Sequence, residues 1–306
     1  MKKIYPKIEP KFLLMYGPQI FDKRFGAIKP EGSLGLIYLA SSLRNKDFEV
    51  SVLDASVGND SYTLEETFFN EKIQPNGLVR VGMDIKDILG EVVDYDVIGI
   101  SSIFTAQTRM VEEVVAEIKR EYPDKIIILG GVNAKSQMSL FFNAGADLIC
   151  LSEAEETIVE IGELLRKGER DFSKINGVAG KEGFVNPRLK IIQNLDELPI
   201  PAWDMLPLEK YWKIARPHGG GLKDGNVAYA SVMFSRGCPF KCHFCHVSKE
   251  IEGSISGNTR KYRTKSIDRV SEEIRILKSL GVKYVFVEDD SMLAKKSRAK
   301  TIFLKI

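Results

Sequence analysis

The sequence has little excess charge, few histidines and few cysteines. Its 44 lysines and arginines nearly balance its 42 aspartates and glutamates, so the formal net charge is only +2. So small a charge does not favour binding to nucleic acid or to an acidic membrane surface. No stretch reaches the roughly 18 uninterrupted apolar residues of a membrane span, and the first residues, MKKIYPKIEP, lack the apolar segment of a signal peptide. We therefore expect a cytoplasmic protein with neither nucleic acid nor membrane among its partners.

The four cysteines are unevenly placed, because three of them lie between Cys238 and Cys245. A small secreted domain would spread an even number of cysteines along its length to form disulfides. The clustering instead predicts a metal or iron–sulfur site in a reducing compartment. The remaining cysteine, Cys150, follows the apolar residues Leu148 and Ile149 and is predicted to be buried in a strand.

The first half of the chain alternates short apolar runs with amphipathic segments. The apolar runs predict buried strands over residues 12–16, 48–53, 97–101, 126–129 and 148–150. The amphipathic segments predict helices over residues 33–44 and 155–166, and one between them with a buried face of Met110, Val111, Val114, Val115 and Ile118. Strands that alternate with helices form a parallel sheet, and continuous apolar strands agree because helices cover both faces. The predicted fold class is α/β, with a doubly wound parallel sheet.

In a doubly wound sheet the ligand binds beyond the carboxyl ends of the strands. Small or polar residues stand at these ends: Ser101, Ser102, Gly130, Gly131, Ser152 and Glu153. Because glycines have no side chain, they would let a large planar ligand approach the backbone. Spacing alone does not distinguish such a site from ordinary turns.

Two stretches of the chain are less regular, one within the first half and one that joins the two halves. Residues 56–91 show no chemistry, although residues 63–70 have a helical pattern, and residues 177–193 predict a small hairpin. Residues 194–204 predict an extended connector with two prolines, and Gly219-Gly220-Gly221 predicts a flexible stretch. We therefore divide the chain into a first domain over residues 1–175, a hairpin and linker over residues 176–226, and a second domain over residues 227–306.

The last part of the chain has the pattern of strands and helices in alternation. It predicts a strand over residues 228–234, a helix over residues 266–280, a strand over residues 282–287 and a further helix near Lys295. Ser266 is a suitable N-cap for the first helix, and Gly281 ends it. Its buried stripe is expected to consist of Ile267, Val270, Ile274, Leu277 and Leu280.

The cysteine loop over residues 235–245 reads Ser-Arg-Gly-Cys-Pro-Phe-Lys-Cys-His-Phe-Cys. Three thiolates this close in sequence can hold three irons of a 4Fe–4S cube and leave the fourth iron open to a substrate. Gly237 and Pro239 favour a loop, which lets the thiolates turn inward together. Zinc is the alternative, because His243 or His246 could complete a Cys3His set. Structural zinc sites usually pair two ligands at each of two separated positions, so the pattern favours an iron–sulfur cluster.

The spacing Cys-x-x-x-Cys-x-x-Cys, with an aromatic residue before the last cysteine, resembles the signature of the radical S-adenosylmethionine (SAM) superfamily. The resemblance implies three cluster ligands: Cys238, Cys242 and Cys245. It implies that Phe244 contributes to cofactor binding, that the methionine group of SAM chelates the open iron, and that one electron splits the sulfonium to a 5′-deoxyadenosyl radical. It also implies a partial (β/α) barrel whose second strand ends in further cofactor-binding residues: Glu288, Asp289 and Asp290.

The first half of the chain resembles the cobalamin-binding domain, flavodoxin-like in fold, that precedes one branch of this superfamily. The resemblance covers most of residues 10–170, and its carriers include Pro-Glu-Gly-Ser-Leu-Gly-Leu at residues 30–36 and Ser-Glu-Ala-Glu-Glu-Thr at residues 152–157. The connector over residues 195–202 is also typical. Asn133 departs from the family, where a histidine is common, and Ser152 and Ala154 replace glycines. The implied cofactor-binding residues are Pro30, Gly32, Gly35, Ser101, Ser102, Gly130, Gly131, Asn133, Ser152 and Glu153.

Some cobalamin proteins coordinate the cobalt with a histidine from a loop after the first strand. Here that loop, over residues 17–35, has no histidine, and all three histidines, His218, His243 and His246, lie outside residues 1–200. Imidazole is the usual nitrogen ligand that a protein offers to such a metal. We therefore expect cobalamin to bind with neither its own base nor a protein histidine on the cobalt (base-off, His-off).

The resemblance implies an enzyme, or the amino-terminal part of one, that uses a 4Fe–4S cluster, SAM and cobalamin for methyl transfer or for a cyclisation or rearrangement. The implied partners are an electron donor such as flavodoxin or ferredoxin and a small-molecule or peptide substrate. Residues 228–306 have room for only part of the family's barrel, so we expect open sheet edges and a radical less shielded from water. The alternatives are a non-catalytic corrin- or cluster-binding fragment and a zinc-binding Cys3His protein.

Overall fold

A seven-stranded sheet forms the centre of the computed structural model, which describes residues 7–25, 32–215 and 227–305. The strand order is β10-β9-β8-β7-β6-β1-β3. Five strands are parallel: β1 (Phe12–Tyr16), β3 (Val50–Asp54), β6 (Val97–Ser101), β7 (Ile126–Gly130) and β8 (Leu148–Cys150). The antiparallel strands β9 (Val178–Gly180) and β10 (Val185–Asn186) extend one edge. The parallel strands confirm the doubly wound α/β fold.

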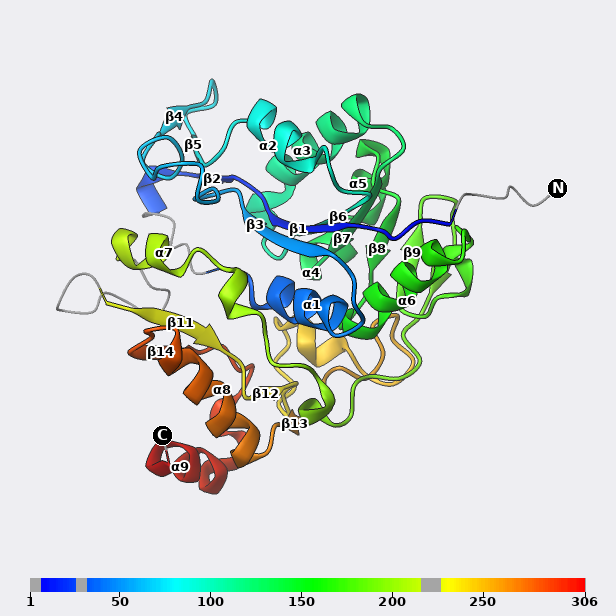
Figure 1. Ribbon diagram of the computed structural model, residues 1–306. Helices are drawn as coiled ribbons and strands as arrows, with labels where there is room; N and C mark the ends of the chain where they lie inside the picture. Colours follow the sequence, from blue (N-terminus) through cyan, green and yellow to red (C-terminus); the bar gives the residue numbers. More distant parts are fainter. Residues whose placement is uncertain (1–6, 26–31, 216–226, 306) are drawn as a thin grey trace.

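Helices cover both faces of this sheet (Figure 1). On one face lie α1 (Leu34–Arg44) and α6 (Glu155–Arg166). On the other lie α2 (Ile85–Val92), α3 (Thr108–Glu121) and α5 (Met138–Ala144). The short α4 (Val132–Ser136) follows β7 directly at the carboxyl edge of the sheet. Two separate apolar cores result, one on each face, which explains why the strands are apolar throughout instead of alternating.

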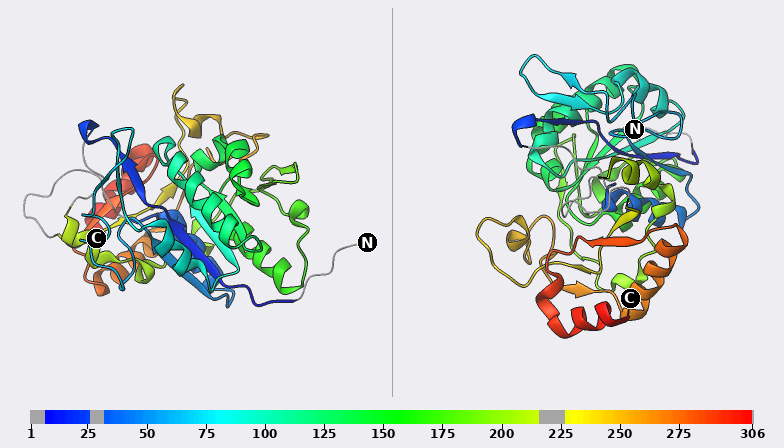
Figure 2. Two further views of the ribbon diagram at one scale, coloured as in Figure 1. Left: turned by 90° about the horizontal axis from the view of Figure 1, so that it is seen from above. Right: turned by 90° about the vertical axis from the view of Figure 1, so that its left-hand side faces the viewer.

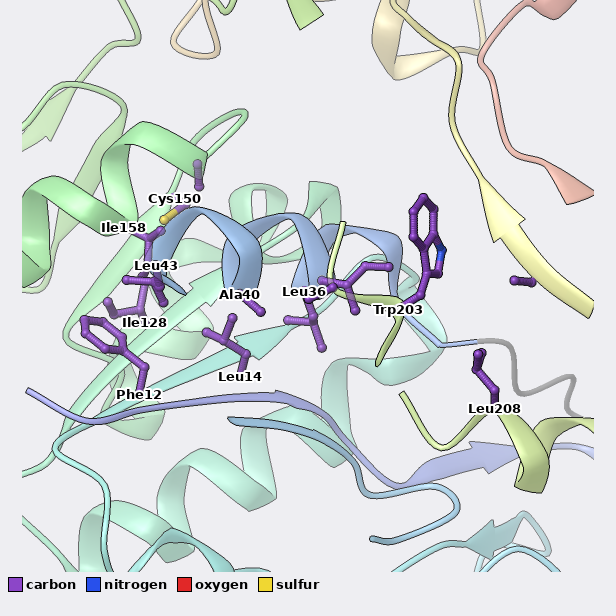
Figure 3. Close-up of a cluster of buried hydrophobic side chains, with 14 of the residues drawn as sticks. Phe12, Leu14, Leu36, Ala40, Leu43, Ile128, Cys150, Ile158, Trp203 and Leu208 are labelled. Carbon is purple, nitrogen blue, oxygen red and sulfur yellow. The ribbon is translucent and has the colours of Figure 1, made fainter. Parts of the chain in front are cut away.

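Helix α1 is buried on almost every side. Leu36, Ala40 and Leu43 point toward Phe12 and Leu14 of the sheet, as Figure 3 shows. Two further residues of α1, Ile37 and Tyr38, are buried as well. The sequence pattern predicts one apolar face for this helix, but a second face is buried because linker residues and the carboxyl-terminal unit pack against it. A helix enclosed in this way joins two parts of a structure.

The carboxyl-terminal unit is a βαβ arrangement that lies below α1 in Figure 1 and in the right-hand view of Figure 2. β11 (Tyr229–Val232) pairs in parallel with β14 (Tyr284–Val287), and α8 (Ile267–Ser279) connects them. β12 (Ser235–Arg236) pairs with β13 (Arg263–Thr264), and α9 (Lys296–Lys305) ends the described chain. The Ser266 hydroxyl accepts a hydrogen bond from the Arg269 N–H and caps α8 as expected. Val270 and Leu277 of the predicted stripe are buried, and so is Glu273 on the same face.

The less regular stretches of the chain differ from the sequence-based expectation in several details. Residues 63–70 form turns instead of a helix, while α2 arises in a segment expected to be irregular. The hairpin over residues 177–193 exists, but it joins the main sheet as β9 and β10. Additional elements are β2 (Gln19–Phe21), β4 (Lys72–Ile73) and β5 (Val79–Val81), which form a small sheet, and α7 (Leu208–Ile214). Short 3-10 helices are η1 (Lys23–Phe25), η2 (Thr105–Gln107), η3 (Phe172–Lys174), η4 (Leu195–Glu197), η5 (Trp203–Met205), η6 (His246–Lys249) and η7 (Met292–Lys295).

Buried polar contacts hold the linker between the two units. The Trp203 indole N–H donates to the Ser231 carbonyl at 3.1 Å, and the Tyr211 hydroxyl donates to the Asp54 carboxylate at 2.8 Å.

The predicted flexible residues Gly219-Gly220-Gly221 lie outside the described residues. Within the described ranges, none of the helices is long and apolar enough to cross a membrane.

Candidate functional site

A cavity of about 400 Å³ lies at the carboxyl ends of the central strands. From the sheet side it is lined by Ser101, Gly130, Gly131, Ser152 and Glu153, together with Gly35 and Tyr38 of α1. From the carboxyl-terminal unit it is lined by Arg236, Gly237, His246, Val247, Glu250, Thr259 and Asp290. The cavity therefore brings the predicted ligand edge of the sheet against the segments on both sides of the three cysteines.

Glycines form part of the cavity wall. The backbone of Gly131 has a φ of +103° and a ψ of 162°, a region that almost only glycine adopts. A Cβ atom built there would lie 2.8 Å from the carbonyl carbon of Ser102 and still closer to its oxygen. Gly130 has no heavy atom within 4 Å of the equivalent position, so its missing side chain leaves open space at the cavity.

These two glycines provide a matched pair of substitutions. We expect Gly131→Ala to lower the free energy of unfolding by about 1–3 kcal/mol, because it strains the backbone and crowds Ser102. Gly130→Ala should leave the stability close to wild type, since its methyl group enters open space. Urea unfolding of both variants measures the difference. Equal stability of the two variants would contradict the geometry of this wall.

Three polar atoms in the wall lack a protein partner. The Ser33 hydroxyl, the Ser152 hydroxyl and the Oε2 atom of Glu155 are buried and have no hydrogen-bond partner in the described part of the chain. Buried polar groups are nearly always paired, so such atoms in one cavity indicate a ligand with polar groups at its edge. A corrin ring, with amide side chains around a flat face, has this chemistry, and the glycine wall gives it room.

The cysteine loop is anchored at its start by the backbone. Gly237 has a φ of +80°, and a side chain there would meet the Thr259 carbonyl oxygen at 2.7 Å. The Cys238 N–H donates to the Arg260 carbonyl at 3.1 Å. At the other end, the Ser248 hydroxyl contacts the Cys245 carbonyl oxygen at 2.7 Å. The loop is thus held at both ends while its centre reaches outward.

The three thiols of this loop are free and accessible. Cys242 is exposed, and Cys238 and Cys245 are partly exposed. Among the described residues, no three His, Cys, Asp or Glu side chains converge closely enough to hold a single metal ion. An iron–sulfur cube does not need such convergence, because each thiolate binds a different iron. The residues present therefore fit a three-cysteine cluster.

The acidic segment after β14 contacts the backbone of the cysteine loop. The Asp289 carboxylate accepts hydrogen bonds from the Phe234 N–H at 2.7 Å and the Ser235 N–H at 3.1 Å. The Asp290 carboxylate accepts from the Gly237 N–H at 2.9 Å. Burial raises the pKa of Asp289, although these hydrogen bonds act in the opposite direction. Both side chains therefore support the start of the loop, and Asp290 also reaches the cavity wall.

Comparison with known proteins agrees with this arrangement. Residues 30–162 match the B12 binding domain, and residues 232–303 match the radical SAM superfamily. The chain belongs to the radical SAM proteins that carry a B12-binding domain. An uncharacterized methyltransferase of Pyrococcus horikoshii is 31% identical to the chain. The match covers 89% of the chain and 52% of the relative. The cytidylyl-2-hydroxyethylphosphonate methyltransferase of Streptomyces wedmorensis is 26% identical, over 88% of the chain and 53% of the relative.

A solved structure shows the same fold. The radical SAM methyltransferase TsrM from Kitasatospora setae, solved with cobalamin and a [4Fe-4S] cluster bound, superposes with a TM-score of 0.63. It is 16% identical, and the match covers 97% of this chain and 50% of that chain. The chain spans about half the length of the two methyltransferase relatives named above. The two domains imply cobalamin, SAM and a 4Fe–4S cluster as cofactors.

The structure places the predicted cofactor-binding residues in two groups. One group lines the cavity: Gly35, Ser101, Gly130, Gly131, Ser152, Glu153 and Asp290. The other lies outside its wall: Gly32, Ser102, Asn133, Phe244, Glu288 and Asp289. Pro30 lies outside the described residues. Phe244 is 94% exposed at the tip of the cysteine loop.

Asn133, which replaces the family's common histidine, is buried behind the wall. Its side-chain amide donates to the Ser102 hydroxyl at 2.8 Å and the Thr108 hydroxyl at 3.0 Å. These bonds connect the end of β6 to the start of α3. In this geometry Asn133 supports the loop that lines the cavity and does not face it.

Sequence reasoning missed several residues of the wall. Tyr38, Arg236, Glu155 and Glu250 were not among the expected site residues, and His246 was considered only as a zinc ligand. Their contacts join positions far apart in the chain, and no local pattern predicts such contacts. Arg236 immediately before the Gly237-Cys238 pair was the one available signal, since a charged residue there must find a partner on folding.

Proposed function

We propose that this chain binds cobalamin in the cavity at the sheet edge and a 4Fe–4S cluster with SAM on the cysteine loop, and that it serves methyl transfer. The observation that carries the proposal is the shared wall: strand ends of the B12-binding domain and residues next to Cys238 and Cys245 line one cavity. When bound, the cluster supplies an electron to SAM and the corrin carries a methyl group. A methyl group would pass from the sulfonium of SAM to the corrin only if the chain held these two molecules close together.

The residues of the chain have distinct roles in this proposal. Cys238, Cys242 and Cys245 bind the cluster as thiolates. The Ser33 and Ser152 hydroxyls, which have no partner in the described structure, pair with polar groups at the edge of the corrin. The apolar side chains and glycines in the wall cover part of the bound groups, and keeping water away protects reactive intermediates.

The relatives support methyl transfer over cyclisation. The two relatives above carry methyltransferase names, as does the hopanoid C-3 methylase of Methylococcus capsulatus, which is 26% identical over 91% of the chain and 45% of its own length. A cyclase relative, the anaerobic magnesium-protoporphyrin IX monomethyl ester cyclase of Rubrivivax gelatinosus, matches over 60% of the chain. We further propose that a reduced flavodoxin or ferredoxin approaches the exposed cysteine loop and that a small molecule or peptide is the substrate.

A product analysis tests this function. Anaerobically reconstituted protein with hydroxocobalamin, SAM and a low-potential reductant should release S-adenosylhomocysteine, because methyl transfer leaves that product. 5′-Deoxyadenosine without S-adenosylhomocysteine would favour the cyclase class. Binding of both cofactors with neither product would favour a non-catalytic binding fragment.

The state of bound cobalt provides a separate prediction. Within the described residues, the cavity wall contains one histidine, His246, and it comes from the cysteine side. We therefore expect cobalamin reduced to Co(II) to show a paramagnetic resonance spectrum without hyperfine splitting from a nitrogen ligand. Clear nitrogen splitting that persists in His246→Ala would mean that the cofactor's own base, or another histidine, stays on the cobalt.

A further inference from the structure

Two arginines frame the cysteine loop at its base. Arg236 on β12 and Arg263 on β13 are direct partners in the pairing of these strands, and the three cysteines lie between them in sequence. The two side chains are nearly buried, with exposures of 12% and 3%. Like charges that face each other across two strands repel. The strands therefore need neutralising groups to stay together.

The neutralising groups come from the acidic loop after β8. Glu153 binds Arg263 through both oxygens, at 2.9 Å and 2.7 Å. Glu155, the first residue of α6, accepts a hydrogen bond from Arg236 at 2.5 Å. Burial would raise the pKa of Glu155, but the adjacent guanidinium outweighs it, and the pKa of this carboxyl is lowered. We call these four residues the arginine–glutamate network.

The arginine–glutamate network also forms part of the cavity wall. Glu153, Glu155 and Arg236 line the cavity, and the Oε2 atom of Glu155 has no partner in the described structure. The Arg236 guanidinium lies 4.8 Å from the ring centre of Tyr38, another wall residue. A molecule bound in the cavity therefore touches the same charges that hold the base of the cysteine loop.

We infer that the arginine–glutamate network positions the cysteine loop against the cavity and couples the two cofactor sites, so that cobalamin binds more tightly when the cluster is in place. The inference rests on the proposed function, because it requires both cofactors to bind. A bound group shifts a loop only through contacts that differ between its states, and the network supplies such contacts on both sides. Its members are positioning residues and are not ligands of either metal.

Equilibrium binding of hydroxocobalamin to cluster-loaded and cluster-free protein tests the coupling. For wild type, we expect the dissociation constant to be at least about fivefold lower with the cluster in place, within the usual range of coupling between sites. For Arg236→Gln, the two constants should agree within about twofold. Arg236→Lys, which keeps the charge but not the fork of donors, should lie between them.

Control variants separate coupling from damage to the fold. Arg44→Gln removes an exposed ion pair with Asp204 of the linker, in which the closest atoms are 2.7 Å apart. It should keep the wild-type ratio between the cobalamin dissociation constants measured without and with the cluster. Glu155→Gln combined with Arg236→Gln removes both charges and avoids an unpaired buried carboxylate. In this double variant, as in Arg236→Gln, the two cobalamin dissociation constants should agree within about twofold. Circular dichroism checks that each variant is folded.

The outcomes distinguish this inference from the proposed function. If wild-type protein binds neither cobalamin nor a cluster, both are wrong. If wild type binds both, with equal cobalamin affinity in the presence and absence of the cluster, the coupling is wrong and the proposed function stands. A wild-type ratio that survives in folded Arg236→Gln and in the double variant would assign the coupling to other residues and overturn the role of the network.

Discussion

Replacing Cys242 with alanine is expected to abolish the iron–sulfur cluster. Wild-type protein reconstituted anaerobically with iron and sulfide should bind about four irons per chain and show a broad absorption band near the visible–ultraviolet border. Cys242 is exposed on the cysteine loop, so its replacement leaves the packing intact and removes one thiolate from a set of three, while the fourth cysteine, Cys150, is buried. Iron and sulfide assays after gel filtration measure the loss.

Cys150 provides the matched control for this experiment. It is buried on β8, and burial raises the pKa of its thiol to about 12. A protonated, buried thiol is a poor metal ligand, so Cys150→Ala should keep the full iron content. Stoichiometric zinc without iron in the wild type, under the same conditions, would overturn the cluster assignment. Retention of a full cluster by Cys242→Ala would overturn the three-cysteine set.

The central sheet was predictable because its signals are local. The expected bounds of β6 and α6 agree with the structure, since an apolar run and a 3.6-residue period each report burial directly. Helix α2 also had such a signal, in Ile85, Ile88, Leu89 and Val92, and the irregular residues before it obscured the pattern. The second buried face of α1 had none, because the covering unit lies far away in the sequence.

The candidate site was predictable at the strand ends and not at the contacts between units. Small residues at the ends of parallel strands predict a ligand edge by topology alone, and Ser101, Gly130 and Gly131 do line the cavity. The pairing of Arg236 with Glu155 joins positions 81 residues apart. A charged residue in a sequence shows that it needs a partner when buried, but the partner is decided only by tertiary packing.

A second buried ion pair should have a large effect on stability. Lys265, after β13, and Glu273, on α8, are 2% and 0% exposed, and their charged atoms lie 2.5 Å apart. Lys265 also donates to the Tyr38 hydroxyl of α1 at 2.7 Å. We expect Glu273→Leu to lower the free energy of unfolding by about 3 kcal/mol, because it leaves a buried ammonium without its counter-charge. Urea unfolding measures this loss, provided that the slope of the unfolding free energy against urea concentration is the same in the variant and the wild type.

Removing both charges should be far less harmful than removing one. In Lys265→Met combined with Glu273→Leu, the buried ammonium is removed as well, and Arg269, which also contacts Glu273 in the wild type, keeps its ion pair with Glu272. Apolar side chains of similar size fill the space, so the stability should return close to wild type. Lys305→Met is the surface control, because its ion pair with Asp268 is 48% and 93% exposed and exposed pairs contribute little. A double variant as unstable as Glu273→Leu would show that the pair is needed for more than charge balance.

The pH dependence of the single variant identifies the cause of its loss. Burial lowers the pKa of Lys265 from its usual 10.5 to about 8 even with Glu273 present, and removal of that carboxylate lowers it further. Between the folded and unfolded pKa values the unfolded chain binds more protons, so stability rises with pH in this window. The deficit of Glu273→Leu relative to the double variant should therefore shrink as the pH rises from about 7 to 10. A deficit that stays constant over this range would mean that lost packing, and not the unpaired ammonium of Lys265, destabilises the variant.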